Sequence, residues 1–235
     1  MLRDLYRRGV LLIAWTLTLI YVRRYEAEGR ENVPREGGVI VASNHLNNAD
    51  PPMIARALRP RYPVFMAKKE MVEKPVVGRL FRAWGAFPVR RGEADLGALR
   101  TATELVRRGE MLLMFPEGTR SRSGTLQRGH PGTAMIAMRT GAPVLPVAVY
   151  GTESIKWPAF FLRPRSVRRV RVVIGEPFTL TGYARINGET AQAATDQIMR
   201  RIAALLPPQY RGAYAGAADG APSSAVTADA TATTA

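Results

Sequence analysis

Several stretches of the chain are apolar at nearly every position, without the alternation of apolar and polar residues that marks a half-exposed strand. The longer ones cover residues 38–42, 111–115, 144–150 and 170–175, and shorter ones lie at 63–67 and 85–89. Continuous apolar runs of this length are typical of strands that are buried on both faces of a sheet. We therefore expect a sheet with both faces covered.

Between these runs, apolar residues recur at the spacing of an amphipathic helix. The predicted helices cover residues 51–58, 75–84, 95–108, 132–139 and 190–206. Strands that alternate with helices predict an α/β fold, with a central mostly parallel or mixed sheet flanked by helices. Pro146 interrupts the run at 144–150, which predicts an edge strand or a bulged strand there.

The N-terminal segment has a different pattern. Residues 9–22 carry no charge, and arginines stand on both sides of them. As a helix the run is about 21 Å long, shorter than the roughly 30 Å hydrocarbon core of a bilayer. We expect a membrane-associated helix over residues 1–25 that lies in or dips into one leaflet. A full span and a helix packed on the domain are the alternatives.

The length of 235 residues suits one domain with appendages. We place this domain at residues 26–212. Residues 213–235 are rich in alanine and threonine and have little to bury, so they are predicted to be a disordered tail.

Composition narrows the chemistry. The absence of cysteine excludes disulfides and a thiol nucleophile, and two histidines leave little room for a metal site, so we expect no metal. The net charge of +15 favours an anionic partner: nucleic acid, an anionic membrane surface, or a phosphorylated substrate or acidic carrier. The chain lacks the Gly-x-Ser-x-Gly elbow of serine hydrolases and the glycine-rich loops of nucleotide-binding proteins.

A polar loop after the run at 38–42 carries His45, and Asp50-Pro51 ends the loop as a helix start. If the loop folds back, the Asp50 carboxylate reaches the His45 imidazole. The carboxylate then fixes the tautomer of the ring and stabilises the imidazolium that forms when the ring takes a proton. The spacing alone occurs by chance in many proteins, so this prediction of a general base depends on the other loops.

Two further loops follow predicted strands. One carries Arg90 and Arg91, and the other contains the segment Glu117-Gly118-Thr119-Arg120. Glycine permits a tight turn, and guanidinium groups bind phosphate through two parallel hydrogen bonds. The three loops together predict activation of a hydroxyl by a histidine base, with a phosphate of the same substrate held nearby. The alternatives are solvated turns and an ordinary Glu–Arg pair.

Four ordered blocks carry a family resemblance: Asn44-His45-x4-Asp50, residues 85–91 (GAFPVRR), residues 115–121 (FPEGTRS) and residues 142–147 (APVLPV). Each block is weak alone, but the four in this order are specific. From about residue 31 to 214 the chain resembles the glycerolipid acyltransferase family, in particular its bacterial 1-acylglycerol-3-phosphate acyltransferase (PlsC-type) branch.

The resemblance implies a reaction. His45, oriented by Asp50, removes the proton from the free hydroxyl of lysophosphatidic acid. The oxygen then attacks the thioester of acyl-CoA or acyl carrier protein, which gives phosphatidic acid without an acyl-enzyme. No cofactor is implied, and the enzyme is expected on the cytoplasmic face of the cell membrane. Backbone N–H groups near the His45 loop are candidates for binding the thioester oxyanion.

The resemblance also implies the residues that bind the acceptor. Arg91 holds the phosphate, Glu117 and Gly118 position the glycerol, and Thr119 and Arg120 support the loop or the phosphate. Many members carry aspartate at the position of Arg90, so either arginine of that pair is a candidate for the phosphate.

Two other interpretations stay open. A different acceptor (glycerol-3-phosphate, another lysophospholipid or a lyso-aminolipid) would keep the same mechanism. A non-catalytic membrane or nucleic-acid binder would use the arginines at 163–171 with the neighbouring Phe160 and Phe161. The ordered blocks and the N-terminal apolar run favour an enzyme at an anionic lipid surface, with no nucleic acid.

Overall fold

A computed structural model of the chain describes residues 20–75, 77–89, 95–155, 166–183 and 185–220, together with Gly9, Leu12 and Thr16. Some predicted features lie outside the described residues: most of the N-terminal helix, the Arg90–Arg91 pair, and residues 156–165 and 221–235. In the part of the chain that the structure describes, no helix combines the length and the apolar character needed to cross a bilayer.

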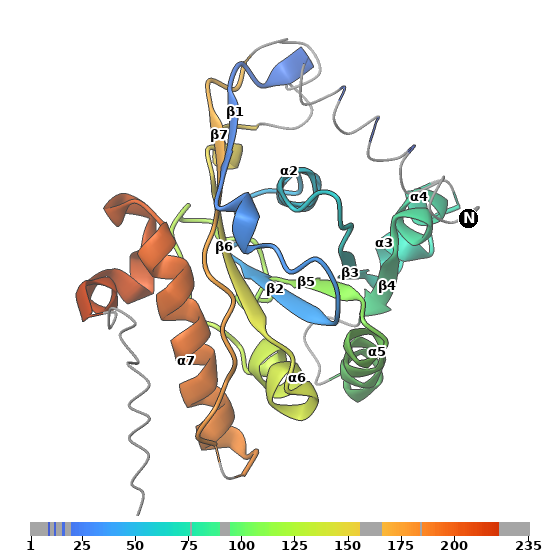
Figure 1. Cartoon of the computed structure of the whole chain (residues 1–235). Helices are drawn as coiled ribbons and strands as arrows, with labels where there is room; N and C mark the ends of the chain where they lie inside the picture. Colours follow the sequence, from blue (N-terminus) through green and yellow to red (C-terminus); the bar gives the residue numbers. More distant parts are fainter. Residues whose placement is uncertain are drawn as a thin grey trace, which may run out of the picture.

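The centre of the fold is a seven-stranded sheet in the order β1-β7-β6-β2-β5-β3-β4 (Figure 1). Every neighbouring pair is parallel except β6 and β7, which are antiparallel. The strands are β1 (Tyr25–Glu28), β2 (Val39–Ser43), β3 (Val64–Lys68), β4 (Ala86–Val89), β5 (Met111–Met114), β6 (Val144–Tyr150) and β7 (Val170–Ile174). The prediction of a mostly parallel or mixed sheet is confirmed.

Helices cover both faces of this sheet, which makes three layers (Figure 1). One face packs against α2 (Asp50–Ala57), α3 (Lys69–Val72) and α4 (Val77–Trp84). The other face packs against α5 (Leu96–Arg107), α6 (Gly132–Thr140) and α7 (Gly188–Leu205). Short turns of 3-10 helix complete the described chain: η1 (Arg30–Asn32), η2 (Thr152–Ser154), η4 (Pro208–Tyr210) and η5 (Gly212–Gly220).

The central strand β2 shows why its sequence is continuously apolar. Val39 and Val41 belong to the core under α2, whereas Ile40 and Ala42 belong to the core under α5, α6 and α7. Successive side chains of a strand point to opposite faces, so a strand between two helix layers needs apolar residues at every position. All five residues of β2 are buried.

The structure corrects the prediction for the strand that contains Pro146. β6 is not an edge strand, because it pairs with β2 on one side and β7 on the other. Proline is tolerated here because its missing N–H falls where the regular ladder with β7 ends, at the pair Val147↔Ile174. The carbonyl of Pro146 still accepts the N–H of Gly175 at 2.9 Å.

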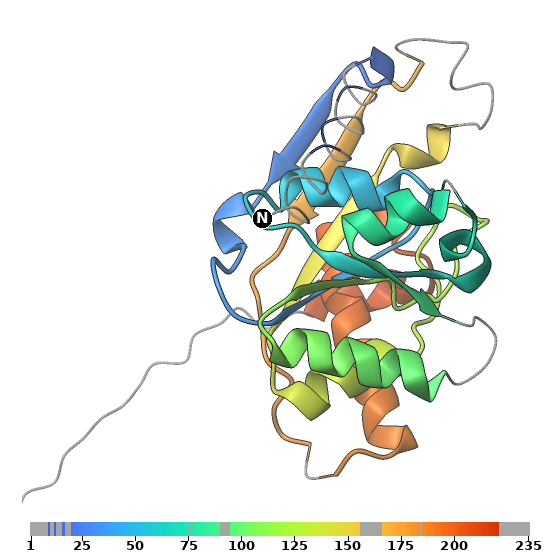
Figure 2. The same cartoon turned by 90° about the vertical axis from the view of Figure 1, so that its right-hand side faces the viewer.

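Both predicted domain boundaries differ from the described structure. Tyr25, assigned to the N-terminal segment, is the first residue of β1, which pairs with β7 (Figure 2). This strand was missed because it is short and charged. An ion pair between its Glu26 and Arg171 of β7 helps to hold it. At the other end, η5 continues to Gly220, and Tyr214 is only 8 % exposed. The folded part therefore extends past residue 212.

Arg61 joins three segments at the amino-terminal edge of the sheet. Its guanidinium donates to the carbonyls of Pro34 at 3.0 Å, Gly37 at 2.7 Å and Gly109 at 2.9 Å. These carbonyls belong to the segments that enter β2 and β5. We expect Arg61→Met to lower the free energy of unfolding by about 1–2 kcal/mol, because water replaces only part of these bonds. Urea denaturation measures this change.

Arg108→Met is the matched control, because the side chain of Arg108 is exposed and forms a long 3.9 Å surface pair with Glu104. It should leave the free energy of unfolding within about 0.5 kcal/mol of the wild-type value. Equal losses in the two variants would contradict the role given to Arg61.

Candidate active site

The site lies at the carboxyl ends of β6, β2 and β5, three neighbouring parallel strands at the centre of the sheet. In open α/β sheets this edge is where ligands bind. Among the described residues, most buried polar side chains gather there, and the only others are three helical threonines. The cluster consists of Ser43, Asn44, His45, Asn47, Asp50, Glu117, Ser121 and Thr152.

His45 and Asp50 form a buried pair. The His45 Nδ1 atom lies 2.8 Å from Asp50 Oδ2, and the two residues are 6 % and 0 % exposed. The His45 ring also stacks on Phe115, with the ring centroids 4.0 Å apart and the planes at 18°. Because Nδ1 faces the carboxylate, Nε2 is the ring atom that can take a proton, and within the described residues it has no hydrogen-bond partner.

The Asp50 carboxylate accepts four hydrogen bonds. Oδ2 accepts from His45 Nδ1 and from the backbone N–H groups of Leu46 at 2.6 Å and Asn47 at 2.7 Å. Oδ1 accepts from the Thr152 hydroxyl at 2.6 Å. The predicted helix start at Asp50-Pro51 is confirmed, because α2 begins at Asp50. The Asp50 carboxylate accepts from N–H groups of the preceding loop.

Glu117 connects the loop after β5 to the loop after β2. Its Oε1 accepts the backbone N–H of His45 at 2.7 Å, and its Oε2 accepts the backbone N–H of Gln127 at 2.9 Å. The residue is only 3 % exposed. Burial raises the pKa of Glu117, and the hydrogen bonds from Gln127 and His45 oppose this rise. The carboxylate is thus occupied by protein donors, and its influence on a bound glycerol would be through the position of the two loops.

Three successive backbone N–H groups donate hydrogen bonds to carboxylates. His45 donates to Glu117, whereas Leu46 and Asn47 both donate to Asp50. These three belong to the backbone N–H groups near the His45 loop, which were the general candidates for binding an oxyanion. The structure uses them to hold the two buried carboxylates, so a thioester oxyanion would need other donors.

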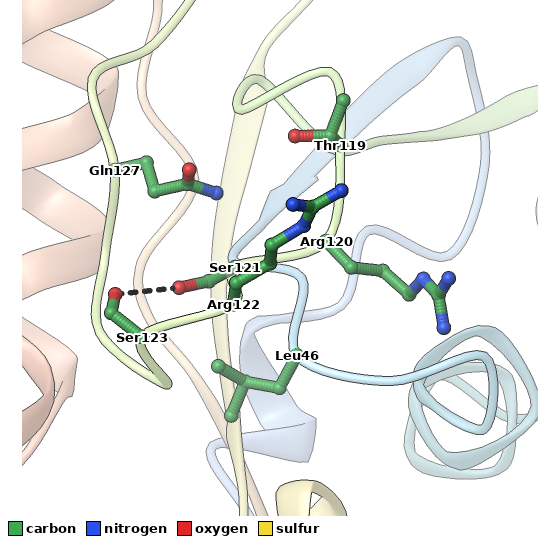
Figure 3. Close-up of a pocket in the computed structure, with 7 residues that line it drawn as sticks. All are labelled: Leu46, Thr119, Arg120, Ser121, Arg122, Ser123 and Gln127. Carbon is green, nitrogen blue, oxygen red and sulfur yellow. Dashed lines mark hydrogen bonds between the residues drawn. The ribbon is translucent and has the colours of Figure 1, made fainter. Parts of the chain in front are cut away.

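A cavity of about 730 Å³ is lined by residues of the loop after β5 and by Leu46, the residue after His45 (Figure 3). Its lining is polar and basic apart from Leu46, and consists of Leu46, Thr119, Arg120, Ser121, Arg122, Ser123 and Gln127. Thr119 and Arg120 are exposed, so their side chains are available to a ligand. Gly118 has φ +69° and donates its N–H to Phe115 at 2.9 Å, which confirms the predicted tight turn. Arg91 lies outside the described residues.

The family is decided by comparison with known proteins. The family model described as Acyltransferase matches residues 24–150, which include β2, β5, β6 and the His45–Asp50 pair. The chain belongs to the acyltransferase family. The reaction class predicted from the ordered blocks is thereby confirmed.

Individual relatives agree with this assignment. The 1-acyl-sn-glycerol-3-phosphate acyltransferase of Bacillus subtilis is 30 % identical over 178 residues, which are 75 % of this chain and 85 % of the relative. The lyso-ornithine lipid O-acyltransferase of Pseudomonas aeruginosa is 32 % identical over 136 residues, which are 57 % of this chain and 51 % of that protein.

A solved structure supports the fold. The crystal structure of the 1-acyl-sn-glycerophosphate (LPA) acyltransferase PlsC from Thermotoga maritima matches with a TM-score of 0.66 at 28 % identity. The match covers 83 % of this acyltransferase and 77 % of the Thermotoga chain. Within its described residues, this acyltransferase has no group of three or more histidine, aspartate or glutamate side chains that could hold a metal ion.

The roles of some site residues were not predicted from the sequence. Asn44 binds both backbone groups of Val149, with Nδ2 to O and N to Oδ1 both at 2.8 Å. Thr152 and Gln127 contact the two buried carboxylates. Thr152 follows the carboxyl end of β6 directly, and this position next to β2 was the signal that could have identified it.

The raised pKa of Glu117 predicts a pH dependence of stability. The folded protein binds the Glu117 proton more tightly than the unfolded chain does. The contribution of this proton to the free energy of unfolding is complete below the unfolded pKa and is lost as the pH rises through the folded pKa. The Glu117→Gln variant has no ionisable group at this position. We therefore expect the difference in free energy of unfolding between wild type and Glu117→Gln to shift against wild type as the pH is raised from about 4, near the unfolded pKa of glutamate. Urea denaturation at several pH values measures it, and a pH-independent difference would contradict it.

Proposed function

We propose that this acyltransferase moves a fatty acyl group from a thioester donor, acyl-CoA or acyl carrier protein, to the free hydroxyl of 1-acyl-sn-glycerol-3-phosphate, which gives phosphatidic acid. The observation that carries the proposal is the buried His45–Asp50 pair, next to Leu46, which lines a basic cavity. The names of the Bacillus relative and of the matched Thermotoga structure support the choice of acceptor.

In the proposed reaction His45 acts as the general base. Nε2 takes the proton of the acceptor hydroxyl, and the oxygen attacks the thioester carbonyl carbon. The carbon–sulfur bond then breaks, and the thiolate leaves with the proton from Nε2. Asp50 stabilises the imidazolium in between, because its carboxylate faces Nδ1–H.

The acceptor phosphate is assigned to the basic groups near the cavity. Arg120 is exposed and lines the cavity with Thr119, so it can present two donors to a phosphate. Arg91 remains part of the proposal as a second phosphate-binding residue. Glu117 and Gly118 shape the loop that carries Arg120, through the bond to His45 and the turn at positive φ.

Membrane association belongs to the same proposal. The acceptor and the product are lipids, and the apolar run at 9–22 is flanked by arginines. We propose that this run attaches the enzyme to the cytoplasmic face of the cell membrane, where anionic lipids attract a chain of net charge +15. The enzyme then needs no resident cofactor, since the acyl donor is a substrate.

A second acceptor class is supported by one comparison. The Pseudomonas relative is named a lyso-ornithine lipid O-acyltransferase, and a lyso-aminolipid of this kind carries no phosphate. The same base would serve, but Arg120 would then contribute little to acceptor binding. The two candidates therefore differ in a measurable way.

The test is acyl transfer from labelled acyl-CoA and acyl carrier protein to lysophosphatidic acid, glycerol-3-phosphate and lyso-ornithine lipid. We expect transfer to lysophosphatidic acid. Arg120→Ala should raise its KM about 10- to 100-fold, the effect of losing a charged hydrogen bond. Arg108→Ala, at the opposite edge of the sheet, should leave KM unchanged. Transfer to lyso-ornithine lipid alone, insensitive to Arg120→Ala, would replace the acceptor; no transfer to any acceptor would overturn the proposal.

A further inference from the structure

Thr152 contacts the oxygen of Asp50 that faces away from His45. It lies in η2, immediately after β6, and is 0 % exposed. Its hydroxyl donates to Asp50 Oδ1 at 2.6 Å, across 102 positions of the chain. Among the described residues this is the one hydrogen bond that Oδ1 receives, whereas the other three bonds of the carboxylate end on Oδ2.

The two ends of the carboxylate are therefore held differently. The terminal torsion of an aspartate side chain has a broad range, so hydrogen bonds decide how the carboxylate plane is turned. The donors on Oδ2 come from the His45 loop itself, and they move when that loop moves. Thr152 comes from η2, the turn that follows β6, so it fixes the carboxylate plane relative to the sheet.

The position of Thr152 does not depend on its bond to Asp50. Gly151 has φ +91°, and a Cβ atom there would lie 2.1 Å from the carbonyl oxygen of Arg169, so the turn is packed tightly against the segment leading to β7. On the other side, Asn47 Nδ2 donates to the Ile155 carbonyl at 3.0 Å. The hydroxyl is thus presented to Asp50 by a segment with its own contacts.

We propose that Thr152 is a positioning residue for acyl transfer: it holds the Asp50 carboxylate in the orientation in which Oδ2 receives Nδ1–H, and so keeps Nε2 of His45 as the basic nitrogen. The inference rests on the proposed function of His45 as the base. It assigns a task to a residue that lies outside the four sequence blocks.

The chain offers a matched control. Thr195 in α7 is also 0 % exposed, and its hydroxyl also makes a short hydrogen bond, 2.7 Å to the carbonyl of Ala191. Thr195 lies on the face of the sheet opposite to α2, which carries Asp50. Replacing either threonine by valine removes one buried hydroxyl and keeps the shape of the side chain. The hydroxyl that is lost binds the Asp50 carboxylate in one variant and a helix carbonyl in the other.

The kinetic test compares Thr152→Val, Thr152→Ser and Thr195→Val. We expect Thr152→Val to lower kcat about 10- to 100-fold, a typical effect of losing a partner that orients a functional side chain, with the KM of donor and acceptor within about twofold of wild type. Thr152→Ser keeps the hydroxyl and should recover most of kcat, and Thr195→Val should leave kcat unchanged. Equal kcat in Thr152→Val and Thr195→Val, or no recovery in Thr152→Ser, would overturn the proposal.

A second measurement does not depend on turnover. The chain has two histidines, so ¹⁵N NMR of the imidazoles gives two sets of signals, and His130→Gln assigns them. We expect Thr152→Val to shift the His45 ring signals away from the Nδ1–H tautomer, and Thr195→Val to leave them in place. If the signals shift in Thr152→Val but the wild-type protein shows no transferase activity, the proposed function is overturned and the positioning role is kept. Unchanged signals in Thr152→Val would overturn the positioning role.

Discussion

His45→Ala should abolish most of the acyl transfer while the protein stays folded. The loss in kcat is expected to be about 10²- to 10⁴-fold, the usual contribution of a positioned general base, with little change in KM. The reason is that Nε2 is the group placed to take the hydroxyl proton, since Nδ1 is bonded to Asp50. Steady-state kinetics with labelled acyl donor, together with thermal unfolding, measures both parts of this result.

His130→Ala is the matched control for this experiment. His130 is exposed, and the hydrogen bond that it gives to Pro116 comes from its backbone N–H, which alanine keeps. We expect wild-type kcat in this variant. If His45→Ala were folded and retained more than about a tenth of wild-type kcat, a histidine base could not be the main catalytic group.

Substitution of Asp50 should separate its charge from its hydrogen bonds. In Asp50→Asn the amide oxygen can still face the three N–H donors, and the amide NH₂ can donate to the Thr152 hydroxyl. The fold should therefore survive. The negative charge that stabilises the imidazolium is gone, so kcat should fall about 10²-fold or more.

Asp50→Ala should lose stability as well as activity. It removes the acceptor of the His45 ring N–H and of the backbone N–H groups of Leu46 and Asn47, all of which are buried. We therefore expect the free energy of unfolding to fall by about 2–5 kcal/mol. Denaturation and kinetics on both variants distinguish the two effects. In the double variant His45→Ala/Asp50→Asn, kcat should be no lower than in His45→Ala, because the charge acts only through the imidazole. Additive losses would contradict that linkage.

Much of the fold could be predicted from local pattern. β2 and β5 were located by continuous apolar runs, because the residues of a strand between two helix layers are buried whichever way they point. α5 and α7 were located by their helical periodicity. Their N-caps, Asp95 and Asn187, each accept a backbone N–H of the first turn.

What could not be predicted depends on contacts between distant segments. β1 forms because β7 pairs with it, and Pro146 is accepted in an inner strand because the ladder with β7 ends there. The local sequence around Asp50 indicates a helix start. It does not show that the carboxylate accepts hydrogen bonds from the preceding loop and from the distant Thr152. The pairing of His45 with Asp50 was predictable because both lie in one loop. The partners of Glu117 were not, since its bond to His45 spans 72 positions.

The long-range bonds of the site also determine when it is completed during folding. Asp50 meets Thr152 across 102 positions, and Asn44 meets Val149 across 105. Closing loops of this length and pairing parallel strands are slow steps, whereas helices form early. A nascent chain that ends before β6 lacks Val149 and Thr152, so it cannot complete the hydrogen bonds of Asn44 and Asp50, however much helix it contains. Recovery of transferase activity during refolding would therefore report the last docking of β6 and η2 onto β2, later than the recovery of helical signal by circular dichroism.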